Sequence, residues 1–182
     1  MSGGWAGQGA VGTEPDDGAG AARVLEAVAD AATALVRTLT GQRRTLAVAE
    51  SLTGGLVAAA ITSVPGASAV LRGSVTAYAT DVKASVLGVD PELLAAEGAV
   101  HPEVAAQMSV GVRRLLGADL GLATTGVAGP TGQDGKPVGL VYVAVCDAEG
   151  RVAVSERRFT GDREAVRRQS VLEVLRLAQE PR

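Results

Sequence analysis

Aromatic residues are almost absent from this chain, in which Trp5, Tyr78, Tyr142 and Phe159 are the only four among 182 residues. Hydrophobic residues still make up 47% of the sequence, so the core is expected to consist of Val, Leu, Ile and Ala side chains. Single-stranded nucleic acid is commonly bound by stacking its bases on aromatic rings. Nucleic acid is therefore not an expected partner.

Cysteine and histidine each occur once, as Cys146 and His101. One cysteine excludes an internal disulfide, and one histidine excludes a histidine-rich metal site. Cys146 lies in an apolar run and is expected to be buried as a small hydrophobic residue. His101 precedes Pro102 at a predicted helix start, where capping is a better interpretation than catalysis.

Long apolar runs are also missing, and no basic segment leads into an apolar signal-like stretch. These absences predict a cytoplasmic protein that has no membrane partner. The formal net charge of -3 comes from the first 20 residues, where Glu14, Asp16 and Asp17 are not balanced by any Lys or Arg. The remaining 17 acidic and 17 basic residues leave the folded part neutral, which again disfavours nucleic-acid and membrane surfaces.

The domain organisation follows from composition and periodicity. Residues 1–20 are rich in glycine and acids and predict a disordered tail, whereas residues 21–182 predict one domain. Helices are predicted after residue 21, after Ser51, over 82–87 and 91–96, from Pro102 to Gly117 and after Asp162. Strands are predicted over 46–49, 74–80, 120–125, 138–145 and 152–159. This order predicts a three-layer α/β/α domain with a mixed sheet of about five strands.

Ser51 follows the first predicted strand and precedes a segment with helical spacing that starts at Leu52. A side chain at such a corner lies near unpaired backbone N–H groups, which favour anions and developing oxyanions. Serine is also a common helix N-cap. Ser51 is therefore interpreted either as a nucleophile or as an ordinary cap.

Three glycine-rich or polar segments follow predicted strands: residues 51–55, 80–83 and 125–139. Ligands of open α/β sheets bind beyond the carboxyl ends of the strands, so these segments are expected to converge on one crevice. Any one of them could equally be a simple turn.

Lysine usage indicates a candidate base. The chain has only two lysines, Lys83 and Lys136, and both lie in these segments. A desolvated lysine can act as a general base near neutral pH, whereas arginine stays protonated. Lys83 is the best partner for Ser51, and Tyr78 on the adjoining predicted strand could relay or orient a proton. The alternatives are two surface lysines and a tyrosine that only packs.

Six arginines lie between residues 151 and 168, and Arg163 and Arg167 are one turn apart on the last predicted helix. Such a pair can bind a phosphate group, although most of the six are expected to be solvated.

Several motifs together resemble the CinA carboxy-terminal domain family, also called nicotinamide-nucleotide amidohydrolases. The resemblance runs from about residue 25 to the end and rests on AESLTGG (49–55), GSVTAY (73–78), Lys83, LGV (87–89), GAV (98–100), TGVAGP (125–130), KPVG (136–139) and GDR (161–163). It does not include the amino-terminal domain of longer CinA proteins, so the pyrophosphatase activity of that domain is not expected here.

The resemblance implies hydrolysis of the carboxamide of nicotinamide mononucleotide, which yields nicotinic acid mononucleotide and ammonia. It implies Ser51, Lys83 and Tyr78 as catalytic residues of a mechanism that requires no metal and no organic cofactor. The implied substrate-binding residues are Thr53, Gly54, Gly55, Thr125, Gly126, Gly129, Lys136, Gly139 and Arg163. A non-catalytic nucleotide-binding or competence-associated module and an amidase for another small amide are the alternatives. An apolar domain with several helices is also expected to form a homodimer.

Overall fold

The computed structural model describes residues 18–180. The elements of this part are α1 (Gly18–Gln42), β1 (Leu46–Glu50), α2 (Leu56–Thr62), the 3-10 helix η1 (Ala67–Ala69), β2 (Leu71–Thr76), α3 (Thr80–Leu87), α4 (Pro91–Glu97), α5 (Pro102–Leu116), β3 (Leu120–Gly126), β4 (Leu140–Cys146), β5 (Val152–Arg158) and α6 (Arg163–Leu177). The first helix starts at Gly18, three residues before its predicted start. The rest of the predicted tail, residues 1–17, lies outside the described residues. Within residues 18–180, none of the helices has the length and hydropathy of a membrane span.

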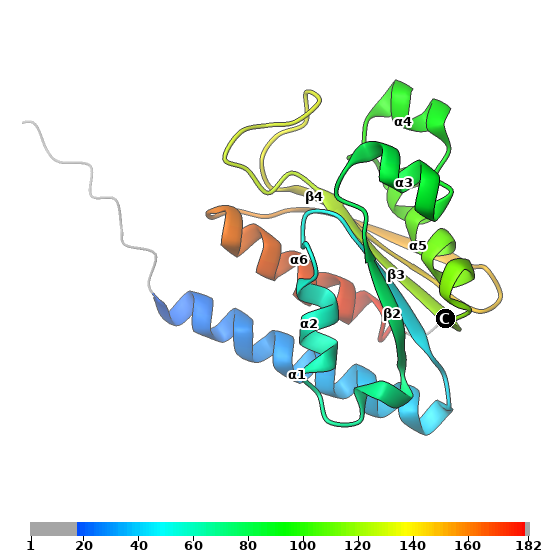
Figure 1. Ribbon diagram of the computed structural model, residues 1–182. Coiled ribbons are helices and arrows are strands. Elements are labelled where there is room, and N and C mark those ends of the chain that lie inside the picture. Colours follow the sequence, from blue (N-terminus) through cyan, green and yellow to red (C-terminus); the bar gives the residue numbers. More distant parts are fainter. Residues whose placement is uncertain (1–17, 181–182) are drawn as a thin grey trace, which may run out of the picture.

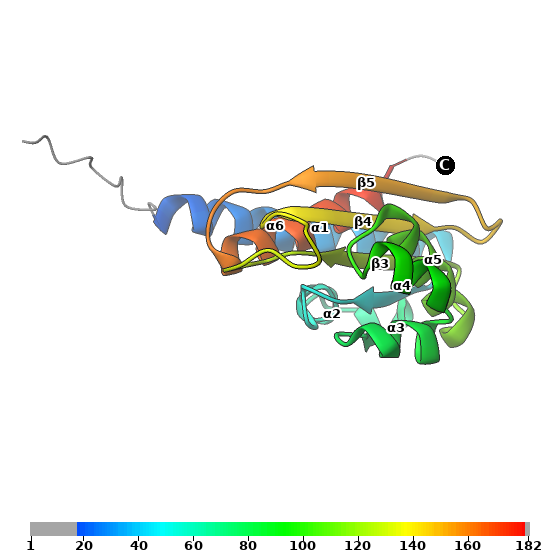
Figure 2. The same ribbon diagram turned by 90° about the horizontal axis from the view of Figure 1, so that it is seen from above.

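The five strands form one sheet in the order β2-β1-β3-β4-β5. Strand β1 pairs in parallel with β2 and β3, whereas β3, β4 and β5 pair antiparallel to one another. Helices α1, α2 and α6 cover one face, and α3, α4 and α5 cover the other (Figures 1 and 2). The predicted three-layer α/β/α fold with a mixed five-stranded sheet is confirmed.

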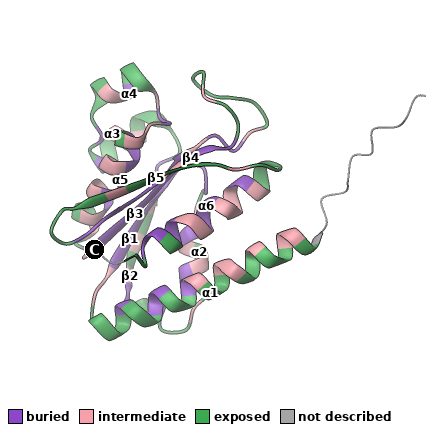
Figure 3. Cartoon of the chain, turned by 180° about the vertical axis from the view of Figure 1, so that it is seen from behind, coloured by how far each residue is buried: buried purple, intermediate pink, exposed green. Residues whose placement is uncertain are grey.

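The two faces of the sheet carry side chains of different size. Large aliphatic residues, including Leu46, Val48, Leu122 and Val143, pack toward α1, α2 and α6. Small residues pack toward α5, and these are Ala47, Ala49, Ala123 and Ala144. Strand side chains alternate between faces, so this pattern follows directly from the sequence. The central strands are buried along most of their length (Figure 3).

The small residues let α5 lie close to the sheet and to α3. A Cβ atom at Gly121 in β3 would come within 2.0 Å of the backbone oxygen of Ser109 in α5. A Cβ atom at Gly111 in α5 would come within 1.9 Å of the backbone oxygen of Leu87, where α3 ends. Because α3 carries Lys83, this approach also fixes the position of the candidate base.

The predicted strand 74–80 is displaced by a few residues. Strand β2 starts at Leu71 and ends at Thr76, because its partner β1 ends at Glu50, which pairs with Thr76. Residues after Thr76 have no strand to pair with. Tyr78 therefore lies in a short connection, and the segment 80–83 is the first turn of α3 where a polar loop was predicted.

Other local predictions are confirmed. The strands predicted over 138–145 and 152–159 are present as β4 and β5, which pair as an antiparallel hairpin. His101 caps α5 by accepting a hydrogen bond from the Glu103 N–H, and Asp162 caps α6 by accepting one from the Ala165 N–H. Cys146 is a buried free cysteine.

The close approach of α5 to α3 predicts that Gly111→Ala destabilises the protein, although alanine normally favours a helix over glycine. The added methyl would overlap the Leu87 carbonyl, and such overpacking costs about 1–3 kcal/mol. The control is Gly41→Ala in α1, where a Cβ atom meets nothing within 4 Å and a gain of up to about 1 kcal/mol is expected. Urea unfolding of both variants measures the difference, and equal stabilities would contradict the packing argument.

Candidate functional site

The carboxyl ends of β1, β2 and β3 lie at the same edge of the sheet, because these strands are parallel. Strand β2, which follows β1 in the chain, pairs with one side of β1, and β3 pairs with the other side. In open α/β sheets a crevice forms at the point where the connections leave in opposite directions. A pocket of about 320 Å³ lies there. It is lined by Ser51, Leu52, Tyr78, Lys83, Ala99, Val100, Thr125, Gly126, Val127, Ala128, Gly129, Thr131, Gly132, Gln133 and Arg163.

Ser51 is not a helix cap. Helix α2 begins only at Leu56. Its N-cap position is occupied by Gly55, which has no side chain that could cap the helix. The Ser51 N–H donates to the backbone oxygen of Thr124 at 3.0 Å, which extends the β1–β3 pairing by one residue. Its Oγ accepts a hydrogen bond from Lys83 Nζ at 3.1 Å. The cap interpretation is therefore wrong, since the hydroxyl faces a lysine inside the pocket.

The Glu50 side chain accepts hydrogen bonds from backbone N–H groups at the start of α2. Its fully buried carboxylate accepts hydrogen bonds from Gly55 at 2.9 Å, Val57 at 3.1 Å and Ala58 at 2.9 Å. The expectation that these N–H groups would be free for an anionic ligand is thus wrong. Sequence reasoning missed this role, although a carboxylate that ends an otherwise apolar strand was a signal for it.

Lys83 is buried, with only 1% of its surface exposed. Burial lowers the pKa of its amine from the ordinary value of 10.5 to about 8. Besides Ser51, its Nζ contacts the backbone oxygens of Ala77 at 2.8 Å and Tyr78 at 3.4 Å. Among residues 18–180 no Asp or Glu lines the pocket, so this part of the chain offers the amine no carboxylate there that would hold its proton.

Tyr78 also lines the pocket, where its hydroxyl contacts Arg163. The side chain is 58% exposed, and its hydroxyl accepts a hydrogen bond from Arg163 Nη2 at 2.8 Å. Only the backbone oxygen of Tyr78 contacts Lys83. In the described residues nothing links the Tyr78 hydroxyl to Ser51, so a proton relay through it stays a prediction.

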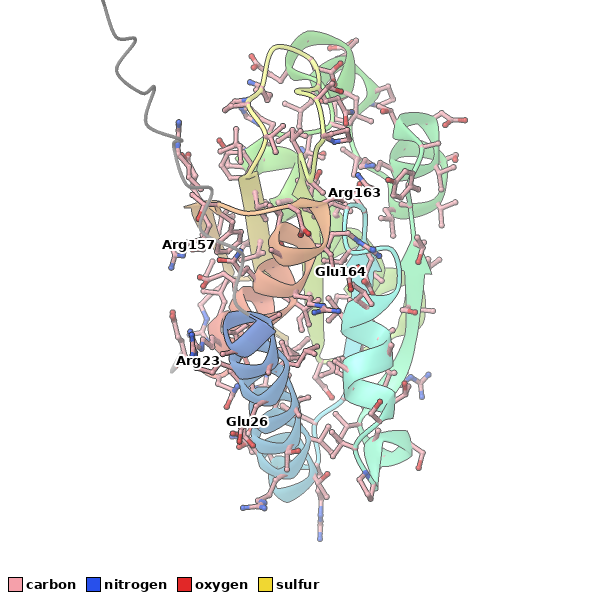
Figure 4. The ribbon with its side chains drawn as sticks, turned by 90° about the vertical axis from the view of Figure 1, so that its left-hand side faces the viewer. Arg23, Glu26, Arg157, Arg163 and Glu164 are labelled. Carbon is pink, nitrogen blue, oxygen red and sulfur yellow. The ribbon has the colours of Figure 1, made fainter. Side chains whose placement is uncertain are left out.

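Arg163 and Arg167 of α6 do not form a shared phosphate clamp. Arg163 lies at the first turn of α6 (Figure 4) and donates to the Gly129 backbone oxygen at 2.7 Å as well as to Tyr78. Arg167 donates to the backbone oxygens of Leu52 at 3.0 Å and Thr53 at 2.8 Å. Only Arg163 lines the pocket.

Thr125, Gly126 and Gly129 of the predicted set line the pocket. The Thr125 hydroxyl donates to the Ala99 backbone oxygen at 2.7 Å, which ties the end of β3 to the segment before α5.

Thr53, Gly54 and Gly55 shape the turn after Ser51 and do not line the pocket. The Thr53 hydroxyl pairs with the Thr124 hydroxyl at 2.8 Å in the protein interior. Gly54 and Gly55 adopt positive φ angles of 60° and 101°, which favour glycine.

Lys136 and Gly139 lie outside the pocket lining as well. Lys136 pairs through its backbone with Gln133 near the tip of the β3–β4 loop. Gly139 is needed for packing, since a Cβ atom there would come within 2.0 Å of the Phe159 backbone oxygen.

Backbone N–H groups that could stabilise an oxyanion remain in the pocket. Among the described residues, the N–H groups of Leu52, Ala128 and Gly129 make no hydrogen bond, and all three residues line the pocket. Donors of this kind stabilise the tetrahedral intermediates of acyl transfer. Within residues 18–180, no group of three His, Cys, Asp or Glu side chains could hold a metal ion.

A comparison with known protein families matches residues 28–181 to the CinA C-terminal domain. The chain belongs to this family. Its relatives include a CinA-like protein of Frankia casuarinae, 56% identical over 73% of this chain and 30% of the relative. A putative competence-damage inducible protein of Desulforamulus reducens is 52% identical over 74% of this chain and 32% of the relative. The chain thus spans about a third of the length of these relatives.

Solved structures of the family have the same fold. The competence/damage inducible protein CihA from Agrobacterium tumefaciens superposes with a TM-score of 0.80 at 35% identity, over 83% of this chain and 93% of that chain. A CinA superfamily protein from Klebsiella pneumoniae superposes with a TM-score of 0.80 at 36% identity, over 83% and 94%.

The Glu50 contacts predict that Glu50→Gln lowers the free energy of unfolding by about 1–3 kcal/mol. The glutamine NH₂ group would face backbone N–H donors that now meet a carboxylate oxygen. Glu26→Gln on the exposed face of α1 is the control, and it is expected to change stability little. Urea unfolding of the two variants is the measurement, and indistinguishable stabilities would count against the capping role.

Proposed function

We propose that this protein hydrolyses the carboxamide of nicotinamide mononucleotide to nicotinic acid mononucleotide and ammonia, with Ser51 as nucleophile and Lys83 as general base. The observation that carries the proposal is the contact between the buried Lys83 amine and the Ser51 hydroxyl at 3.1 Å. An amine with a pKa of about 8 is partly neutral at physiological pH and can accept the serine proton.

The surroundings of Lys83 orient its lone pair. In the neutral amine, the two hydrogens can be donated to the backbone oxygens of Ala77 and Tyr78. The remaining tetrahedral position then faces Ser51 Oγ, so the lone pair can receive the hydroxyl proton. Two carbonyl groups thus serve the orienting function that a carboxylate serves in a Ser-His-Asp triad.

The reaction proceeds in two stages. Ser51 Oγ bonds to the carboxamide carbon while its proton passes to Lys83 Nζ, and the negative oxygen is stabilised by backbone N–H groups of Leu52 and of the 128–129 segment. Lys83 passes the proton to the leaving nitrogen, the C–N bond breaks, and ammonia departs. Water then attacks the ester and gives a proton to Lys83, which returns it to Ser51 as the acid leaves.

The pocket suits an anionic substrate. Within residues 18–180 no acidic side chain lines it, and Arg163 supplies a positive charge that remains when the Lys83 amine is neutral. Arg163 donates only to uncharged acceptors, so a phosphate group would be a stronger partner for it. Val100 and Val127 supply apolar wall for a pyridine ring. Because Lys136 does not line the pocket, the phosphate is assigned to Arg163 alone.

Replacing the nucleophile tests the enzyme against the binding-module alternative. Ser51→Ala is expected to lower ammonia release from nicotinamide mononucleotide at least about 1,000-fold and to leave binding measurable by calorimetry. Ser85→Ala, an exposed serine on α3, is the control and should retain full activity. Ammonia release by Ser51→Ala at the control's rate would overturn the nucleophile. Binding by wild type with no ammonia produced would favour the binding module.

The lowered pKa of Lys83 sets the expected pH dependence. The protonated amine cannot accept a proton, so kcat/KM, which reports the free enzyme, should rise with pH through an apparent pKa near 8 and level off above it. Lys83→Met should abolish both the activity and this dependence. Ammonia release measured from pH 6 to pH 10 gives the profile, and a rate that falls as pH rises through 8 would contradict the role of Lys83.

A further inference from the structure

Arg167 contacts the turn that carries the nucleophile, although Arg167 itself does not line the pocket. Its Nε donates to the Leu52 backbone oxygen at 3.0 Å, and its Nη2 donates to the Thr53 backbone oxygen at 2.8 Å. The contacts join residues that are 115 and 114 positions apart in the sequence. Neither the family motifs nor the pocket lining includes Arg167, so its role has to be read from these contacts.

The two carbonyl groups belong to the central residues of a tight turn. The Gly54 N–H donates to the Ser51 backbone oxygen at 3.1 Å, which closes a turn over residues 51–54. Arg167 therefore holds both peptide groups in the middle of that turn. A planar peptide fixes its N–H when its carbonyl is fixed, so the bidentate contact orients the 52–53 and 53–54 peptide groups, two of the three in the turn.

Among the described residues, no carboxylate lies within ion-pair distance of the Arg167 guanidinium and competes with the two carbonyl groups for it. Its neighbour Arg168, in contrast, pairs with Glu164. Charged donors form stronger hydrogen bonds to carbonyl groups than neutral donors do. The approach is also close, since a Cβ atom at Gly54 would lie 3.3 Å from Arg167 Nη2. The glycine thus leaves room for the guanidinium.

We propose that Arg167 is a positioning residue, which holds the 51–54 turn so that Ser51 Oγ stays within reach of Lys83 and of the reacting carbon. This role rests on the proposed nucleophilic function of Ser51. It assigns Arg167 to the chemical step and not to phosphate binding. Displacing a reacting group by about 1 Å can lower a rate about 100-fold.

The test compares Arg167→Met with Arg168→Met, which removes an arginine from the same helix without touching the turn. Arg167→Met is expected to lower kcat for ammonia release about 100-fold while KM stays within about threefold. Arg167→Lys keeps a charged donor, so its kcat should be about tenfold higher than that of Arg167→Met. Thermal unfolding of each variant verifies that the protein is folded under assay conditions.

A second readout does not depend on the substrate. A fluorophosphonate probe forms a P–O bond to a nucleophilic serine and releases fluoride, and intact mass reports the rate of Ser51 labelling. Slow labelling in Arg167→Met, with wild-type rates in Arg168→Met, would support the role even if nicotinamide mononucleotide proved not to be the substrate. Equal kcat and labelling rates in the two variants would overturn it, as would a loss confined to KM. Absence of Ser51 labelling in wild type would overturn both the nucleophile and the positioning role.

Discussion

The hydrogen bond between Lys83 and Ser51 joins the end of β1 to α3 and places a buried amine against a hydroxyl. A desolvated ammonium is costly unless it is paired, and in the described part of the chain no acidic residue lines this pocket to pair with it. The protein therefore lowers the pKa of the amine and surrounds it with backbone oxygens and the serine. Every other feature of the site either holds these two side chains in place or leaves space for a ligand beside them.

Two charged residues beside the 51–58 segment, Glu50 and Arg167, hold its backbone. Glu50 binds the N–H groups at the start of α2, and Arg167 binds the carbonyl groups of the turn before it. One anion and one cation thus satisfy opposite ends of the same short segment. Residues 51–55 of this segment have no regular secondary structure of their own, so such contacts are what give them a fixed conformation.

The sheet contributes through the size of its side chains. Alanines and glycine on one face allow α5 to approach β3 closely, and α5 in turn contacts the end of α3 through Gly111. The position of Lys83 is thereby set by packing far from the pocket. On the other face, larger aliphatic residues space α6 so that its first turns meet the loops after β1 and β3.

Local signals in the sequence determined most of the secondary structure, the mixed sheet and the candidate pair Ser51 and Lys83. Periodicity, capping residues and the scarcity of lysine are all visible without a structure. The tertiary structure decided which neighbours the polar groups meet. Glu50 occupies the helix N–H groups, Arg167 turns to the backbone, Tyr78 faces Arg163, and Lys136 lies outside the pocket. Some of these contacts join residues that are distant in the sequence, and others depend on the direction in which a side chain points. No local sequence pattern specifies the distant partner or the side-chain direction.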